Sequence, residues 1–442
     1  MKSIIIASNC SGGGKTTFTL GLMKAIENRN LKVQGYKVGP DYIDPAFHKE
    51  VTGNISRNLD SFLMGEDGVK YSYLKGNGDV GIIEGVMGLY DGIGVSEKSS
   101  TFDISRILGN MPIILVLSPK GQSLSICAEI NGFINYKNAN IAGVVLNSVS
   151  EKYYKLLKYA IEKNCNVKVF GYVPKDDRIQ LKSRHLGLVQ SMEVLNLKEK
   201  LDIFGQLIEE YIDLDEILHS MKEFKGNKEN TIENKICKLN KNKIKIGVAF
   251  DKAFSFYYKD NLELLEKIGD VKYFSPLKDT EIPDDLDFLY IGGGYPEVFK
   301  EELERNSSMR NSIYAALENG LRCYAECGGL MYLTEKIDGA KMVGYFQGES
   351  TMTKSLQRFG YCNVKIVEEY LGKTFNINAH EFHKSQINSK LSNIYNVEKT
   401  QYDGEVINWA CGYLKNNTIG GYAHINFLGN IEFLKSIVGY KE

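Results

Sequence analysis

The fold of the N-terminal half is decided by the stretch MKSIIIASNCSGGGKTTFTLGLMKAIE, residues 1–27. The apolar run Ser3–Ala7 is typical of a buried strand, and Thr16–Glu27 is typical of a helix. A glycine-rich loop joins the two, and its residues are Ser11, Gly12, Gly13, Gly14, Lys15, Thr16 and Thr17. Glycines let backbone N–H groups approach a phosphate closely, and the helix N-terminus adds partial positive charge. The stretch therefore predicts a nucleotide-phosphate site after the first strand.

Two side chains of this loop have expected roles. Lys15 would reach the β- and γ-phosphates of a nucleotide, and the Thr16 hydroxyl would bind Mg²⁺. The loop departs from the usual pattern at its opening glycine, which is Asn9 here. Strand, loop and helix nevertheless follow in the required order, so we expect a nucleotide and Mg²⁺ to bind here.

Short apolar runs alternate with helix-length segments along the rest of the chain. Near-continuous apolar runs are typical of parallel strands covered on both faces. In the first half these runs are Val80–Glu84, Pro112–Leu117, Ile141–Leu146 and Val167–Val173. A second series comprises Ile244–Phe250, Val271–Phe274, Leu286–Ile291 and Leu321–Ala325. The pattern predicts an α/β protein with two doubly wound domains.

A polar segment separates the two series. Residues 222–243, KEFKGNKENTIENKICKLNKNK, are rich in lysine and asparagine and poor in large apolar side chains. Such a composition buries too little surface to offset the entropy of ordering. We therefore expect domains at 1–221 and 244–442, joined by a linker at 222–243.

The composition argues against nucleic acid and membranes as partners. The 54 Lys and Arg residues nearly balance the 55 Asp and Glu residues, so no field of one sign attracts either. No apolar run reaches the roughly 18 residues of a membrane span, and the first run is too short for a signal peptide. The eight cysteines are scattered without a CxxC pair, which favours reduced thiols. We therefore expect a cytoplasmic protein.

Acidic residues lie where the chemistry of a bound nucleotide would need them. The segment KVGPDYIDP at 37–45 contributes Lys37, Asp41 and Asp44, and IEGVMGLYDG at 83–92 contributes Glu84 and Asp91. Glu84 ends a predicted strand, at the sheet edge where ligands bind, and is a natural Mg²⁺ ligand. For the three aspartates, ordinary turn chemistry beside Pro and Gly is the alternative.

Asn147 follows the predicted strand Ile141–Leu146. Its amide could hydrogen-bond the edge of an adenine, and structural capping is an equally good interpretation.

The second half contains a candidate nucleophile. In CYAECGGLM, residues 323–331, Cys327 lies between a predicted strand and a predicted helix. A thiol at a helix N-terminus has a lowered pKa, which favours a nucleophilic thiolate. The backbone N–H groups of Gly294 and Gly328 could form an oxyanion hole. Cys323, on the strand itself, is expected to be a packing residue.

A thiolate needs a proton carrier, and His424 in GGYAHINF, residues 420–427, is the candidate. The rival bases are His380 and His383 in AHEFH, residues 379–383.

Many strings of the chain together resemble the cobyrinic acid a,c-diamide synthase family, in order and approximate spacing over its whole length. They are GGKTTFTLGL, YKVGPDYIDPAFH, RNLDSFLM, IEGVMGLYDG, RHLGLV, AFSFYYKDNLELLE, FSPLKD, YIGGGYPE, YAECGGLMYL, QRFGY, HEFHKS and GYAHINF.

The resemblance implies a carbon–nitrogen ligase that uses ATP, Mg²⁺ and glutamine to amidate the a and c acetates of cobyrinic acid or a related tetrapyrrole. The first half is then similar to P-loop, dethiobiotin-synthetase-like domains, and the second to class I glutamine amidotransferases. Cys327 falls on the family's glutaminase nucleophile and His424 on its partner. The acidic positions of the ATP-dependent half-reaction, with Lys37 beside them, are Asp41, Asp44, Glu84 and Asp91.

The sequence departs from related patterns at two positions. Other class I glutaminases place Glu two residues after the histidine, where this chain has Asn426. We therefore expect a Cys–His pair assisted by some other group. Lys384 stands where a tyrosine is more usual, which affects local substrate contacts alone.

Alternative functions remain open at this point. Nickel-sirohydrochlorin a,c-diamide synthase performs the same chemistry on another macrocycle. Cobyric acid synthase fits less well, because the GPDYIDP and RHLGL strings are not expected there. A MinD-like switch ATPase that binds partners is an alternative from another class, and the attached Cys327 domain argues against it. A homodimer is compatible with the sequence.

Overall fold

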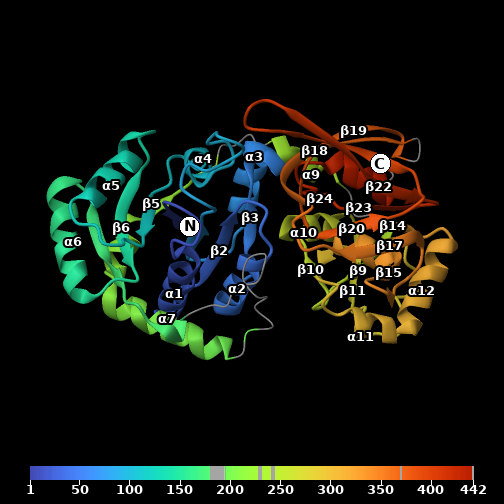
Figure 1. Cartoon of the computed structure of the whole chain (residues 1–442), viewed down its shortest axis with the longest axis horizontal. Coiled ribbons are helices and arrows are strands. Elements are labelled where there is room, and N and C mark those ends of the chain that lie inside the picture. Colours follow the sequence, from blue (N-terminus) through green and yellow to red (C-terminus); the bar gives the residue numbers. More distant parts are fainter. Residues whose placement is uncertain (180–193, 195, 227–230, 240–243, 369–370, 441–442) are drawn as a thin grey trace. The chain divides into compact units, whose positions relative to one another are not determined.

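The computed structural model describes residues 1–179, 194, 196–226, 231–239, 244–368 and 371–440. The chain forms two compact units, which are coloured from blue to green and from yellow to red in Figure 1. Unit 1 comprises Met1–Ser61 and Gly65–Asn230, and unit 2 comprises Phe62–Met64 and Thr231–Glu442. The RHLGLV string at 184–189 lies outside the described residues, as do 227–230 and 240–243 of the expected linker.

Unit 1 is built on a parallel sheet. Its strand order is β3 (Arg57–Leu59), β2 (Val33–Val38), β4 (Val80–Glu84), β1 (Lys2–Ser8), β5 (Ile113–Leu117), β6 (Ile141–Asn147) and β7 (Lys168–Val173). The parallel neighbours of β1 are β4 and β5, so the chain crosses over on both sides of it. This is the doubly wound arrangement that the apolar runs predict, and the five strands expected in this half agree with β1 and β4–β7.

Helices cover both faces of this sheet. Alternate residues of β5 enter different cores: Ile114 and Val116 pack in a cluster with α1, while Leu115 and Leu117 pack in another with α5 and α6. Burial on both faces explains why these strands are almost wholly apolar. The helices of unit 1 are α1 (Lys15–Asn28), α2 (Ile43–Thr52), α3 (Ser61–Leu74, broken at Gly65), α4 (Thr101–Ile107), α5 (Ser125–Asn135), α6 (Glu151–Asn164), a 3-10 turn (Asp177–Ile179), α7 (Leu197–Tyr211) and α8 (Leu214–Ser220).

The segment expected to be a linker contains regular structure. β8 (Lys222–Glu223) pairs antiparallel with the start of β1, and α9 (Thr231–Cys237) follows in unit 2. Ile232, Ile236 and Leu239 are buried. These few apolar residues stand at helical spacing, so one face of a short helix can pack although the segment as a whole is polar.

Unit 2 also has a parallel sheet, and this sheet continues into long antiparallel strands. The parallel part is β11 (Gly269–Phe274), β9 (Ile244–Ala249), β12 (Phe288–Ile291), β14 (Arg322–Glu326) and β23 (Thr418–Gly421). The antiparallel part is β22 (Val406–Lys415), β21 (Asn393–Thr400), β18 (Arg358–Glu368), β19 (Lys373–His383) and β24 (His424–Ile425). The antiparallel extension is a feature that the doubly wound expectation did not include.

Smaller elements complete unit 2. A two-stranded sheet pairs β10 (Phe254–Phe256) with β13 (Gly293–Gly294). A four-stranded sheet joins β16 (Ala340–Lys341), β15 (Thr334–Ile337), β17 (Phe346–Met352) and β20 (Ser385–Asn388). The remaining helices are α10 (Lys259–Ile268), α11 (Lys300–Arg305), α12 (Ser307–Glu318), α13 (Gly328–Leu333) and α14 (Ile431–Val438).

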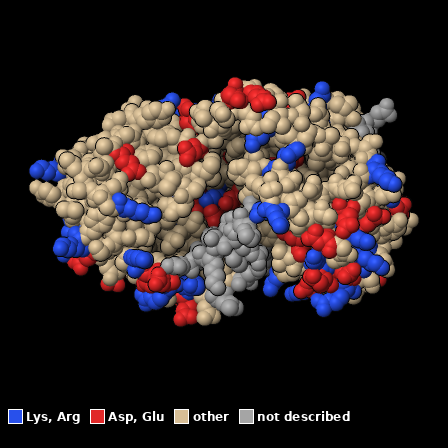
Figure 2. Space-filling view, in the orientation of Figure 1, with Lys and Arg blue, Asp and Glu red and all other residues tan. Residues whose placement is uncertain are grey.

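The surface carries charges of both signs. Figure 2 shows blue and red side chains intermixed over the part of unit 2 that holds α11 and β11. Among the described residues, no helix combines the length and apolar content needed to cross a membrane. All eight cysteines carry free thiols.

Candidate functional sites

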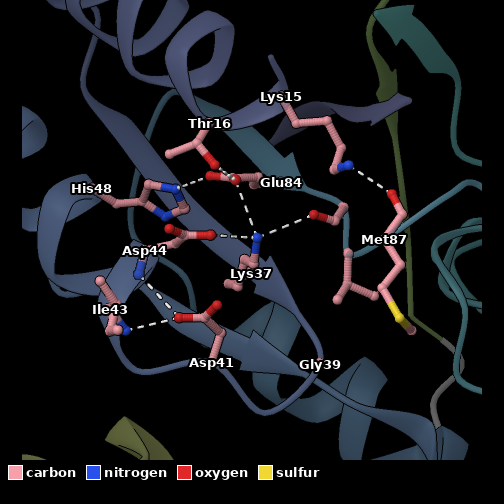
Figure 3. A network of polar contacts seen from close by, with 12 residues as sticks. Lys15, Thr16, Lys37, Gly39, Asp41, Ile43, Asp44, His48, Glu84 and Met87 are labelled. Carbon is pink, nitrogen blue, oxygen red and sulfur yellow. Dashed lines mark hydrogen bonds and ion pairs between the residues drawn. The ribbon is translucent and has the colours of Figure 1, made fainter. Parts of the chain in front are cut away.

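The glycine-rich loop lies between β1 and α1. Gly14, just before α1, has φ 90°, which favours glycine, and a Cβ there would lie 2.2 Å from Nδ2 of Asn147. Lys15 is buried, and its Nζ donates to the carbonyl oxygens of Cys10 (2.9 Å) and Met87 (2.6 Å; Figure 3). The lysine ammonium is thus held between the loop and the segment that follows β4.

Glu84 is the centre of a buried polar network beside this loop (Figure 3). Its Oε1 accepts hydrogen bonds from Thr16 Oγ1 at 2.5 Å and from Lys37 Nζ at 3.1 Å. Lys37 Nζ also lies 2.5 Å from Oδ2 of Asp44. The side chains come from α1, β2, α2 and β4, so the parallel sheet brings Thr16, Lys37, Asp44 and Glu84 together as the sequence predicts for one site.

His48 belongs to the same network, although it was not among the predicted site residues. Its Nε2 is 2.7 Å from Glu84 Oε2, and its Nδ1 is 3.0 Å from Ser56 Oγ. The His48 side chain is fully buried. The signal that could have found it is its place at the end of the string YKVGPDYIDPAFH, on the same helix as Asp44.

The charges of this network depend on one another. Burial alone would lower the pKa of Lys37, but attraction to Asp44 and Glu84 outweighs burial and raises it. Burial alone would raise the pKa of Glu84, but attraction to Lys37 and the hydrogen bond to His48 outweigh burial and lower it. The pKa of Asp44 is raised well above its usual range by burial and by the carboxylates of Asp41 and Glu84. Lys37 is shared between these two carboxylates. Because the pKa of Asp44 is raised and that of Glu84 is lowered, Asp44 is the one more readily protonated. Burial and the positive charge of Lys37 lower the pKa of Lys15 to about 8.

Asp41 and Asp91 stabilise the backbone around this network. Asp41 Oδ1 accepts from the backbone N–H groups of Ile43 (2.8 Å) and Asp44 (3.0 Å) at the start of α2. Asp91 is exposed, and its Oδ2 accepts from the N–H of Gly88 at 2.9 Å within its own turn. Both contacts are hydrogen bonds of the kind that aspartates make in turns, which was the alternative to a role in the chemistry of the nucleotide.

Asn147, at the end of β6, supports the glycine-rich loop. Its Nδ2 donates to Ser118 Oγ at 3.0 Å, and Ser118 Oγ donates to the carbonyl oxygen of Gly13 at 3.1 Å. Through this chain of hydrogen bonds Asn147 has a structural role, which was one of its two expected roles. Ser11 and Gly12 are exposed at the tip of the loop, and Thr17 lies in the first turn of α1.

Cys327 occupies a strained turn between β14 and α13. Its φ of 47° and ψ of −100° are unusual for a residue with a side chain, and such strain is typical of functional turns. The backbone N–H of Cys327 donates to the carbonyl oxygen of Gly421 at 2.8 Å. Because β14 pairs in parallel with β23, this places Cys327 beside the segment that leads to His424. Cys323 is buried within β14, as expected for a packing residue.

The glycines of β13 and α13 let backbone segments converge on this turn. A Cβ at Gly293 would lie 2.5 Å from Cε1 of His424, so the ring packs directly against that glycine. A Cβ at Gly328 would lie 3.0 Å from the backbone nitrogen of Gly294. The two predicted oxyanion-hole residues, Gly294 and Gly328, are therefore neighbours.

His424 is buried, and its surroundings favour the protonated form of its ring. Burial alone would lower its pKa, but interactions with Cys327 and with Glu326 outweigh burial and raise the pKa to about 10. Its Nδ1 lies 3.6 Å from Oε2 of Glu326, the residue directly before the cysteine. Glu326 was absent from the predicted site residues, although the string YAECGGL contains it.

The rival histidines lie in β19. The His380 ring stacks on His424 with centroids 4.9 Å apart, and its Nδ1 is 3.2 Å from the hydroxyl of Tyr258. His383 stacks on Tyr422 at 3.8 Å, and its Nδ1 is 2.8 Å from the carbonyl oxygen of Ser385. Burial and the charge of His424 lower the pKa of His380 well below its usual value, so His380 is neutral.

Comparison with known domain families matches both halves of the chain. Residues 4–189 match the CobQ/CobB/MinD/ParA nucleotide binding domain. Residues 245–431 match the CobB/CobQ-like glutamine amidotransferase domain. The first match contains the glycine-rich loop and Glu84, and the second contains Cys327 and His424.

Curated relatives extend the similarity over the full length. The cobyrinate a,c-diamide synthase of Clostridium tetani is 56% identical, covering 99% of this chain and 100% of the relative. That of Clostridium acetobutylicum is 57% identical with the same coverage. That of Methanocaldococcus jannaschii is 42% identical over 100% of both chains. The chain therefore belongs to the cobyrinate a,c-diamide synthase family.

Proposed function

We propose that this protein is a cobyrinate a,c-diamide synthase of cytoplasmic cobalamin biosynthesis. It amidates the a and c acetate carboxylates of cobyrinic acid with glutamine-derived ammonia at the expense of ATP. The observation that carries the proposal is the 56% identity over the full length of a relative with that name. Residues 1–221 form the ATP-dependent domain, and residues 244–442 form the glutamine amidotransferase domain. Residues 222–243 connect the two domains.

In the first domain, Lys15 and the loop N–H groups bind the nucleotide phosphates. Lys15 already lies between two backbone carbonyls, so a phosphate oxygen replaces neutral partners with a charged one. Lys37, Asp41, Asp44 and Asp91 belong to the ATP-dependent half-reaction, and Asn147 can turn its amide to the adenine edge.

The side chains fit a Mg²⁺ ion that arrives with the nucleotide. Thr16 Oγ1 and Glu84 Oε1 are 2.5 Å apart, which offers a hydroxyl ligand backed by a carboxylate. Among the described residues, no group of three or more His, Cys, Asp or Glu could hold a metal. Mg²⁺ is commonly held by few protein oxygens together with phosphates, and it neutralises phosphate charge.

In the second domain, Cys327 Sγ attacks the side-chain amide carbon of glutamine. The N–H groups of Gly294 and Gly328 stabilise the oxyanion, a contribution of about 3–4 kcal/mol per donor. His424 gives its proton to the leaving nitrogen, and ammonia departs. Water then hydrolyses the thioester, which releases glutamate and restores the thiol.

The two half-reactions meet at the substrate carboxylate. A carboxylate oxygen attacks the γ-phosphorus of ATP, ADP leaves, and an acyl phosphate forms. Ammonia attacks the acyl carbon, a C–N bond forms, and inorganic phosphate leaves. Phosphorylation by ATP thereby gives the acyl carbon phosphate as a good leaving group, which the free carboxylate lacks.

The test compares macrocycles side by side. The purified protein is incubated with ATP, glutamine and either cobyrinic acid or nickel-sirohydrochlorin, and the products are weighed by mass spectrometry. We expect two amidations on cobyrinic acid at a higher kcat/KM. Faster diamidation of nickel-sirohydrochlorin would assign the chain to that reaction instead, and product from neither would contradict the proposal.

A further inference from the structure

The glutaminase site has a buried carboxylate that the proposed mechanism does not yet use. Glu326 ends β14, directly before Cys327, and only 2% of it is exposed. Asn426, two residues after His424, is occupied elsewhere: its Oδ1 accepts from the N–H groups of Leu428 (3.0 Å) and Gly429 (3.3 Å). The amide of Asn426 thus shapes the following turn.

We propose that Glu326 is a positioning residue that orients His424 toward Cys327 and stabilises its positive charge. The inference rests on the proposed glutamine hydrolysis at Cys327 and deepens it. The carboxylate comes from the strand before the nucleophile, so one short segment supplies both the thiol and the anion that supports the thiol's proton carrier.

The geometry holds the carboxylate in a single orientation. The Tyr290 hydroxyl donates to Glu326 Oε2 at 3.0 Å, and the backbone N–H of Ile425 donates to Oε1 at 3.1 Å. Tyr290 lies on β12, which neighbours β14 in the sheet. Since Ile425 directly follows His424, Glu326 binds both the ring and the backbone of the segment that carries it.

The separation of Glu326 and His424 fits a positioning role. At 3.6 Å, Oε2 and Nδ1 are within ion-pair distance but beyond a direct hydrogen bond. Catalytic contacts are often long without substrate and shorten in the reacting complex. A carboxylate facing Nδ1 favours a proton on that nitrogen, which leaves Nε2 to exchange a proton with the thiol.

The other groups around the ring do not supply a negative charge that lasts through the reaction. His380, from β19, stacks on His424 and is neutral because burial lowers its pKa. Behind it, the Tyr258 hydroxyl contacts His380. Cys327, directly before α13, also raises the pKa of His424. The thiolate loses its charge when it attacks the glutamine amide, so the carboxylate of Glu326 is the negative charge that stays beside protonated His424 through the covalent step.

The test is Glu326→Gln in the full-length protein. Glutamine keeps the shape, and its Oε1 can still accept from Ile425, but the negative charge is lost. We expect kcat for glutamine hydrolysis to fall about 10- to 100-fold with little change in KM. His424 then loses its proton at a lower pH. On the alkaline side of the profile, kcat/KM should therefore begin to fall at a lower pH than in the wild-type protein. Amidation with ammonia stays at the wild-type level.

Glu381→Gln is the matched control. Glu381 is equally buried, and its Oε2 lies 3.5 Å from His383 Nε2 in β19. We expect this variant to keep the wild-type kcat and pH profile. Equal losses in both variants would mean that any buried carboxylate of unit 2 has this effect, and would overturn the inference.

Two further variants keep the test decisive if Glu326→Gln folds poorly. Glu326→Asp retains the charge and should retain the wild-type alkaline limb. Tyr290→Phe removes the hydroxyl that holds Glu326 and should lower kcat less than Glu326→Gln does. Wild-type kcat and pH profile in Glu326→Gln or, failing that, in Tyr290→Phe would overturn the inference. Wild-type protein that hydrolyses no glutamine would instead refute the proposed function.

Discussion

Cys327→Ser is expected to abolish glutamine-dependent amidation and to leave amidation with a high concentration of ammonia unchanged. The serine hydroxyl cannot be ionised beside His424 as a thiol can, so the covalent step fails. We expect the rate of glutamine hydrolysis to fall on the order of 10³-fold or more. The measurement is amide formation with each nitrogen source in parallel.

Cys323→Ser provides the control on the same strand. Cys323 is buried in β14, and burial raises the pKa of its thiol, so this cysteine is not a nucleophile. The control should retain both activities. Equal loss of the glutamine- and ammonia-dependent activities in Cys327→Ser would contradict the division of labour between the two domains.

Lys15→Ala is expected to remove amidation with either nitrogen source. The ammonium contacts the carbonyl oxygens of Cys10 and Met87, at the position where a nucleotide phosphate would bind. Loss of one charged donor to a reacting group lowers kcat by about 10²- to 10³-fold. Amide formation with saturating ammonia measures this directly, while glutamine hydrolysis reports on unit 2 separately.

Lys24→Ala is the matched control, on the same helix as Lys15. Lys24 pairs with Asp202 at 2.8 Å on the surface of unit 1, and surface pairs contribute little to stability. This variant should keep both activities. Substantial synthesis by Lys15→Ala with ammonia would mean that the phosphate site is elsewhere.

Most strands of the two parallel sheets could be predicted from the sequence, because burial on both faces leaves a continuous apolar run. The parallel strands β2, β3 and β23 were not expected, because they are short or carry polar side chains. Ser3–Ala7 and Val80–Glu84 were expected, and β1 and β4 span Lys2–Ser8 and Val80–Glu84. The end of such a strand locates a side chain at the ligand edge of the sheet, as Glu84 illustrates. The antiparallel strands β19 and β21 were not expected, because one exposed face leaves them with alternating polar residues.

Other parts of the sites could not be predicted because they depend on contacts between distant segments. His48 meets Glu84 across 36 residues, and Tyr290 meets Glu326 across the same separation. Neither pair has a spacing that marks it in one sequence. Glu326 lies inside a recognisable string, but its distance to His424 depends on the pairing of β14 with β23.

The most direct test of the central claim follows the nitrogen atom. The protein is incubated with ATP, cobyrinic acid, amide-¹⁵N glutamine and unlabelled ammonium at low concentration, and the product is analysed by mass spectrometry. We expect a diamide that carries ¹⁵N at both new amides, formed only when ATP is present. Unlabelled amides in a reaction that consumes glutamine, or labelled amides formed without ATP, would contradict it.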